Sequence, residues 1–142
     1  MAEAALLAWK DAWSVDVPEI DRQHAALMAE FARLIDPARR DDYAFQRAAL
    51  VVLTGHVCRH FDYEEHLMHV HHYPDFGPHA EAHAELLKQL NHFEMLVKAQ
   101  PEDGPGPDIV AFVGRWLFDH TQGDDKRLGT FLRDRHEVRK AS

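Results

Sequence analysis

The chain has 142 residues, and because a domain takes roughly 100–200 residues, we expect one domain over residues 1–142 with its core at about 13–135. Sixteen Lys and Arg against 24 Asp and Glu give a net charge of −8 without a basic run, so we expect no nucleic-acid partner. The single Cys58 excludes an internal disulfide. The apolar stretch 4–9 is too short for a secretion signal or a membrane span, so we expect a cytoplasmic protein without membrane insertion.

Apolar residues recur at helical spacing in four segments, and no segment alternates as a half-buried strand does. The first predicted helix covers about 19–35 and ends before a proline, since the residue preceding proline disfavours the α conformation. The second covers about 42–69, and its expected inward face consists of Phe45, Ala49, Val52, His56 or Leu53, His60, Glu64 and Leu67.

The third predicted helix follows Asp75, which can cap it unless a neighbouring residue does, and continues to about residue 97. The fourth begins near Asp108, with Phe112 on its inward face, and a short last helix covers about 125–135. Long helices joined by short links favour antiparallel neighbours. The sequence therefore predicts an all-α, up-down-up-down antiparallel four-helix bundle with an N-terminal arm and a short C-terminal helix.

Polar side chains occupy inward positions on all four long helices and on the last one. They are five of the 12 histidines and two carboxylates: His24, His60, Glu64, His79, His83, His120 and Asp125. His60 with Glu64, and His79 with His83, are four residues apart, so each pair lies on one face of its helix. A lone inward histidine is usually a hydrogen-bonded core residue. Seven such groups in an apolar core are costly without compensation, so the set indicates a metal site.

Asp125 follows His120 by five residues, which does not keep one face of a regular helix, and Gly123 supplies the freedom to bend the backbone between them. Seven ligands are too many for one ion but suit two, if both carboxylates bridge. One ion then has three histidines and the other two, which leaves one coordination position open. Imidazole, carboxylate and an oxo or hydroxo bridge suit iron, although zinc, manganese or cobalt can occupy such ligands.

Two other metal motifs are excluded. In His79-Ala-Glu-Ala-His83 the glutamate is third, whereas the zinc-protease motif H-E-x-x-H has it second. The chain contains no Glu-x-x-His, which disfavours the carboxylate-rich, ferritin-like di-iron oxidases.

Four segments resemble the hemerythrin family, most closely its single-domain bacterial members. They are Trp13-Ser-Val-Asp-Val-Pro-Glu-Ile-Asp-Arg-Gln-His24, His60-Phe-Asp-Tyr-Glu64-Glu65, Tyr73-Pro74 leading to His79 and His83, and Trp116-Leu-Phe-Asp-His120 with Asp125-Lys126. They extend over about residues 13–126 and fill every ligand position of the family. The resemblance implies two iron ions with an oxo or hydroxo bridge, and reversible O₂ binding.

The same resemblance implies individual roles. His79, His83 and His120 hold the filled iron, His24 and His60 the open one, and Glu64 and Asp125 bridge them. The implied O₂ pocket is lined by Leu27, Phe61, Trp116, Leu117 and Thr121. Thr121 departs from the isoleucine common in the family, and we hypothesise that its hydroxyl speeds autoxidation. Asp16 stands where glycine is usual, which indicates a different turn.

Storage or transport of O₂ is the favoured function, with an oxygen-consuming enzyme as the client and no catalytic activity of the chain itself. Two alternatives stay open: a sensor of O₂, nitric oxide or redox state that acts through a partner protein, and a peroxide-consuming di-iron enzyme. The oligomeric state is open too. Asp21, Gln23 and Glu65 are either caps and surface pairs or partners of the ligand imidazoles. The histidines outside the site are expected at the surface or beside the ligands.

Overall fold

The computed structural model describes residues 10–100 and 102–141, with side chains as far as residue 135; the stretch 4–9 lies outside them. The described chain is helical and contains no strand. Its elements are η1 (Asp11–Trp13), α2 (Pro18–Leu34), η2 (Pro37–Arg39), α3 (Tyr43–Val70), α4 (Phe76–Ala99), α5 (Pro107–Gln122) and α6 (Asp124–Ala141). No helix in these ranges is long and apolar enough to cross a membrane.

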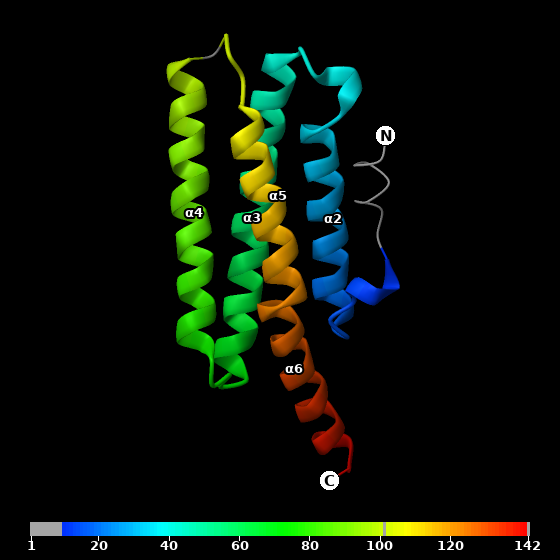
Figure 1. Cartoon of the computed structure of the whole chain (residues 1–142). Helices are drawn as coiled ribbons and strands as arrows, with labels where there is room; N and C mark the ends of the chain where they lie inside the picture. Colours follow the sequence, from blue (N-terminus) through cyan, green and yellow to red (C-terminus); the bar gives the residue numbers. More distant parts are fainter. Residues whose placement is uncertain (1–9, 101, 142) are drawn as a thin grey trace.

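Helices α2, α3, α4 and α5 run alternately in opposite directions, so the predicted antiparallel four-helix bundle is confirmed (Figure 1). Helix α6 follows α5 and continues past the end of the bundle (Figure 1). It has 18 residues, so the expectation of a short last helix ending near residue 135 was wrong. The physical reason is that neither glycine nor proline occurs after Gly129 to interrupt it.

The helix ends follow local chemistry. Pro18 and Pro107 occupy the first turns of α2 and α5, where the missing N–H of proline costs nothing. The Asp42 carboxylate caps α3 by accepting a hydrogen bond from the Phe45 N–H at 3.0 Å. Asp75 precedes α4 as expected, but its side chain makes no capping hydrogen bond.

Two apolar clusters fill the core, one on each side of a polar layer. The large apolar cluster contains Leu27, Phe31, Leu34, Ala49, Leu50, Leu53, Val57, Phe61, Leu86, Leu90, Val97 and Val113. The small apolar cluster contains Val15, Ile20, Met68, Tyr73 and Leu128, with Phe131 and Leu132 packed against it. The polar layer lies between them because the buried positions of α2 and α3 pass from one cluster to the other through histidine and glutamate.

Two residues expected inside are on the surface. Val52 and Phe112 are each 41% exposed, whereas Val57 and Val113 are fully buried. Helix α3 is 28 residues long and its buried stripe runs through Leu53 and Val57, so Val52 lies on the outer side. The ring of Phe112 packs edge-on against Phe93 with 5.6 Å between centroids, which leaves its outer face in solvent.

The N-terminal arm, residues 10–17, lies against α6. Gly129 permits this approach, because a Cβ there would overlap the backbone carbonyl of Val15. Lys126 Nζ donates a hydrogen bond to the carbonyl of Ala12 at 2.9 Å, and the Asp21 carboxylate accepts one from the Val15 N–H at 2.8 Å. Asp21 is therefore a cap of the arm and not a partner of a ligand imidazole.

Candidate metal centre

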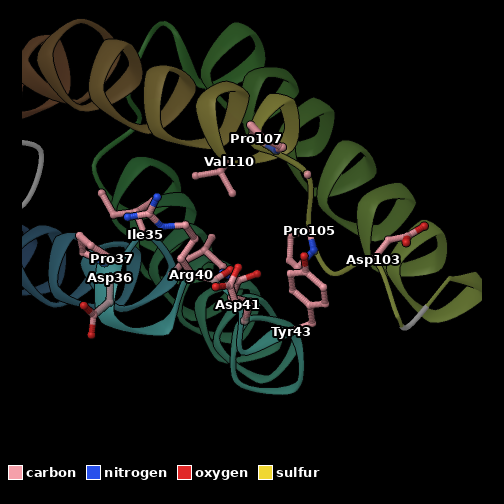
Figure 2. A pocket seen from close by; sticks show the side chains of 13 residues that line it. Ile35, Asp36, Pro37, Arg40, Asp41, Tyr43, Asp103, Pro105, Pro107 and Val110 are labelled. Carbon is pink, nitrogen blue, oxygen red and sulfur yellow. The ribbon is translucent and has the colours of Figure 1, made fainter.

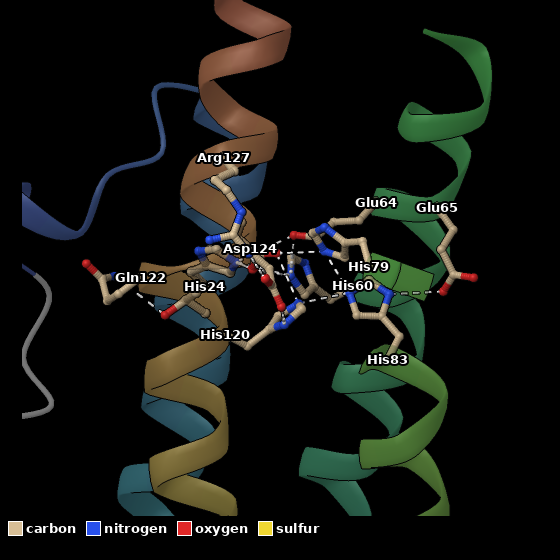
Figure 3. Close-up of polar contacts among 12 residues, drawn as sticks. His24, His60, Glu64, Glu65, His79, His83, His120, Gln122, Asp124 and Arg127 are labelled. Carbon is tan, nitrogen blue, oxygen red and sulfur yellow. Dashed lines mark hydrogen bonds and ion pairs between the residues drawn. The ribbon is translucent and has the colours of Figure 1, made fainter. Parts of the chain in front are cut away.

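Buried side chains from α2, α3, α4, α5 and α6 form one polar layer, and Figure 3 shows polar contacts among its residues. The structure brings together all seven candidate ligands, and each is at most 6% exposed. They come from α2 (His24), α3 (His60 and Glu64), α4 (His79 and His83), α5 (His120) and α6 (Asp125). The i, i+4 pairs on α3 and α4 place two donors per helix in the same layer.

The donor atoms form two groups, in each of which all atoms lie within 4.8 Å of one another. The five-ligand group is Glu64, His79, His83, His120 and Asp125, and the four-ligand group is His24, His60, Glu64 and Asp125. Glu64 and Asp125 belong to both groups. The two groups are thus unequal in ligand number and share two carboxylates.

The spacing of the donors fits metal coordination. His24 Nε2 lies 3.1 Å from His60 Nε2, and His83 Nε2 lies 3.0 Å from His120 Nε2. Two ligands at about 2.0–2.1 Å from one ion and at right angles to each other lie roughly 2.9–3.0 Å apart. Glu64 Oε2 and Asp125 Oδ1 are buried and make no hydrogen bond of acceptable geometry within the described chain, although imidazole Nε2 atoms lie 3.0–3.1 Å from each of them. A cation held between these rings and oxygens would satisfy both carboxylates.

The charges of the layer are strongly coupled. Burial by itself lowers the pKa of His60 and of His79, but the Asp125 and Glu64 carboxylates outweigh it and raise both pKa values to about 9. Burial likewise raises the pKa of Glu64 and Asp125, and the surrounding imidazoles reverse this and hold both pKa values well below the ordinary range. The layer thus holds two ionised carboxylates that attract cations, either protons or metal.

Gly123 separates α5 from α6 and brings Asp125 into the layer. Its backbone lies at φ −107° and ψ −84°, outside the helical region, and a new helix begins at the next residue. The break rotates α6 relative to α5, so Asp125 is 0% exposed although it follows His120 by five residues. The bend expected from the sequence is present.

Three ligand imidazoles hold an acceptor on their outer nitrogen. His60 Nδ1 donates to Gln23 Oε1 at 2.6 Å, His83 Nδ1 to Glu65 Oε2 at 3.1 Å, and His120 Nδ1 to Asp124 Oδ2 at 3.0 Å. These bonds orient each ring so that its other nitrogen faces the polar layer, as the outer partners of metal-binding histidines do.

The sequence left the roles of Gln23 and Glu65 open and missed Asp124. Asp124 follows His120 by four residues, which indicates that the two share a helix face. This spacing was not used in the prediction because the inward position was assigned to Asp125.

A small apolar pocket of about 50 Å³ adjoins the four-ligand group. It is lined by Trp13, His24, Leu27, Met28, Phe31, Gly114, Leu117, Phe118 and Thr121. Leu27, Leu117 and Thr121 were expected to line the O₂ pocket, whereas Phe61 and Trp116 lie elsewhere. Phe61 stacks on His83 with 3.7 Å between centroids, and Trp116 stacks on His120 at 4.5 Å. Both aromatic rings thus support the five-ligand group.

A second hollow, of about 580 Å³, opens between η2 and residues 103–107 (Figure 2). Its lining includes Asp36, Pro37, Arg40 and Tyr43 and none of the seven candidate ligands. The larger hollow is therefore separate from the polar layer. The histidines outside the layer, from His56 to His92, are partly or fully exposed where the structure describes them.

Residues 15–132 match the family model of the hemerythrin HHE cation binding domain. The chain belongs to the hemerythrin family. It is 27% identical over 126 residues to bacteriohemerythrin of Stenotrophomonas maltophilia (strain R551-3). This alignment covers 86% of this chain and 78% of that protein. Bacteriohemerythrin of Pseudomonas aeruginosa (strain LESB58) is 26% identical over 121 residues, covering 85% and 78%. A crystal structure of wild-type hemerythrin superposes with a TM-score of 0.79 at 28% identity, covering 86% of this chain and 94% of that one.

Proposed function

We propose that this hemerythrin-family chain binds O₂ reversibly, for storage or delivery, at a di-iron centre held by the seven residues of the polar layer. Delivery implies an oxygen-consuming enzyme as the client. The observation that carries the proposal is the position of the apolar pocket. It adjoins His24, a member of the four-ligand group, which is the group with fewer protein ligands and hence with room for a further ligand.

The iron ions, when bound, supply the two electrons that O₂ takes up on binding and returns on release. The chain supplies the surroundings. The five imidazoles would be neutral donors when metallated, and Glu64 and Asp125 would offset two of the positive charges of the cations. Leu27, Phe31 and Leu117 present apolar surface to the pocket and exclude water there.

Apart from His24, which is one of the candidate metal ligands, the pocket is lined by no titratable side chain, which favours binding over catalysis. Thr121 also lines the pocket and carries a hydroxyl, but this hydroxyl donates its hydrogen bond to the Phe118 carbonyl at 3.1 Å. The indole of Trp13 completes the polar atoms of the lining. General acid catalysis needs a titratable group within reach of the reacting atom, and the described lining lacks a carboxylic acid.

The test is to assay iron per chain, reduce the protein anaerobically, and cycle it between air and vacuum while recording the visible spectrum. We expect two irons per chain and a charge-transfer band that appears with O₂ and disappears on its removal. His24→Ala should abolish the band, whereas His92→Ala, at an exposed histidine of α4, should retain it. A band that appears once and decays to an unresponsive oxidised form would overturn reversible binding and favour sensing or peroxide chemistry.

A further inference from the structure

The two ligand groups differ on the side of the imidazoles that faces away from the metal. In the five-ligand group, the outer nitrogens of His83 and His120 donate to carboxylates, Glu65 and Asp124. In the four-ligand group, His60 donates to the neutral amide oxygen of Gln23. The outer nitrogen of His24 is buried and makes no hydrogen bond within the described chain.

A carboxylate on the outer nitrogen strengthens an imidazole as a ligand. It draws the N–H proton toward itself, which raises the electron density on the opposite nitrogen, and it fixes the ring in the metal-binding orientation. A neutral amide also fixes the ring orientation, but it raises the electron density on the opposite nitrogen only a little. Glu65 and Asp124 are only about one-third exposed, at 34% and 33% of their side chains, so solvent screens their charges incompletely.

We propose that Glu65 and Asp124 make the two metal sites unequal, so that the first metal ion enters the five-ligand group and the second enters the four-ligand group. The inference rests on the proposed function only in assuming that the layer binds two ions. Glu65 has the larger effect. Asp124 also pairs with Arg127, which withdraws part of its charge from His120.

Loading order has a consequence for the centre. Once the first ion is bound by His79, His83 and His120, it fixes Glu64 and Asp125, which are shared. The four-ligand group is then assembled around a preset pair of carboxylates and closes on the second ion. The ion beside the apolar pocket is thus the last to bind and the first to leave.

The experiment is an anaerobic titration of the metal-free protein with Co²⁺, followed by its visible absorption. The wild-type chain should bind in two resolved steps. Glu65→Gln should weaken the first step by about 10–100-fold, the range measured for such outer partners, and Asp124→Asn should weaken it less. Glu81→Gln is the matched control, because Glu81 is an exposed acid on α4 between His79 and His83.

A second variant tests the opposite direction. Gln23 Nε2 donates to Glu19 Oε1 at 3.2 Å, so exchanging the two residues, as Glu19→Gln with Gln23→Glu, preserves net charge and an amide-to-carboxylate contact. The exchange places a carboxylate on His60 and should tighten the second step while leaving the first unchanged.

Weakening of both steps equally by Glu65→Gln, or tightening of the first step by the exchange, would overturn the proposed order. Because Co²⁺ binding is measured without O₂, this outcome is independent of the oxygen cycling that tests the proposed function.

Discussion

The two apolar clusters on either side of the polar layer differ in what holds them together. The large apolar cluster joins α2, α3, α4 and α5 through twelve buried residues, whereas the small apolar cluster has five, drawn from the arm, α2, the α3–α4 region and α6. Stabilisation by burial scales with apolar area. We therefore expect the large cluster to stay packed without metal, and the small cluster to depend on a metal that connects α4 and α6 to the other helices. We infer that metal occupancy controls one end of the bundle more than the other.

Metal removal is the largest perturbation and tests this contrast directly. We expect the metal-free protein to lose about 4 kcal/mol of stability for each ion removed, relative to protein at a free metal concentration 1,000 times the Kd of that ion. Amide hydrogen exchange should accelerate in α6 and the arm and remain slow in the middle of α3. Protection lost evenly along all five helices would contradict the contrast between the clusters.

Leucine truncation in each cluster sharpens the comparison. Leu53 and Leu128 are both 0% exposed, so Leu53→Ala and Leu128→Ala should each cost about 2–5 kcal/mol in the metal-loaded protein. In the metal-free protein Leu53→Ala should still lower the free energy of unfolding by the same amount. Leu128→Ala should lower it much less, because the small cluster is already loosened without metal. Urea unfolding of both variants with and without metal measures this. An undiminished cost of Leu128→Ala without metal would show that the small cluster holds by itself.

The pH dependence should separate the two forms. His60 and His79 have folded pKa values raised from 6.5 to about 9, so their protonation stabilises the metal-free fold fully below about pH 6.5. This contribution is lost as the pH rises from about 6.5 to 9. Metal binding requires neutral imidazoles, so the metal affinity rises over the same pH window. The loaded protein therefore gains stability relative to the metal-free protein as the pH rises. Thermal unfolding should therefore show a growing difference between loaded and metal-free protein, and parallel curves would exclude proton competition at these histidines.

Much of the fold and of the site could be predicted because both follow from helical periodicity. The four-residue spacing of His60 with Glu64 determines their common face, and Gly123 indicated the bend that turns Asp125 inward. Periodicity defines the inward direction only to within one residue, which is why Val52 was misplaced. On a helix packed on two sides, adjacent positions compete for burial.

Partners outside the ligand layer were harder to predict. Asp124 and Asp125 are adjacent acids, and only the three-dimensional break at Gly123 determines that one faces the layer and the other faces the outer nitrogen of His120. Trp116 lies on the same helix as Leu117, yet it stacks on a ligand ring while Leu117 lines the pocket. Sequence spacing gives the helix face, and packing against neighbouring helices decides which cavity a side chain enters.

A substitution of Thr121 tests how the polarity of the apolar pocket affects oxidation of the centre. It is 5% exposed and adds a hydroxyl to a lining that is otherwise mostly apolar. Thr121→Val removes the hydroxyl at nearly constant shape, so we expect slower autoxidation, by several-fold, because water is held less well beside His24. The rate at which the oxidised form appears in air measures this. An unchanged rate would show that the hydroxyl, engaged with the Phe118 carbonyl, has no part in oxidation.

The smallest expected effect concerns the arm that covers the small cluster. Asp16 has a φ of 64°, in the left-handed region that glycine adopts most readily and aspartate tolerates better than most residues. Its carboxylate accepts a hydrogen bond from Arg133 Nη1 at 2.9 Å, an exposed pair worth little by itself. Asp16→Gly and Asp16→Ala both remove this pair and differ only in their tolerance of the backbone, so the glycine variant should be the more stable by about 1 kcal/mol in thermal unfolding. We expect this difference only in the metal-loaded protein, because in the metal-free protein the arm separates before the bundle unfolds. Equal unfolding temperatures of the two variants in the loaded protein would mean that the arm detaches first there too.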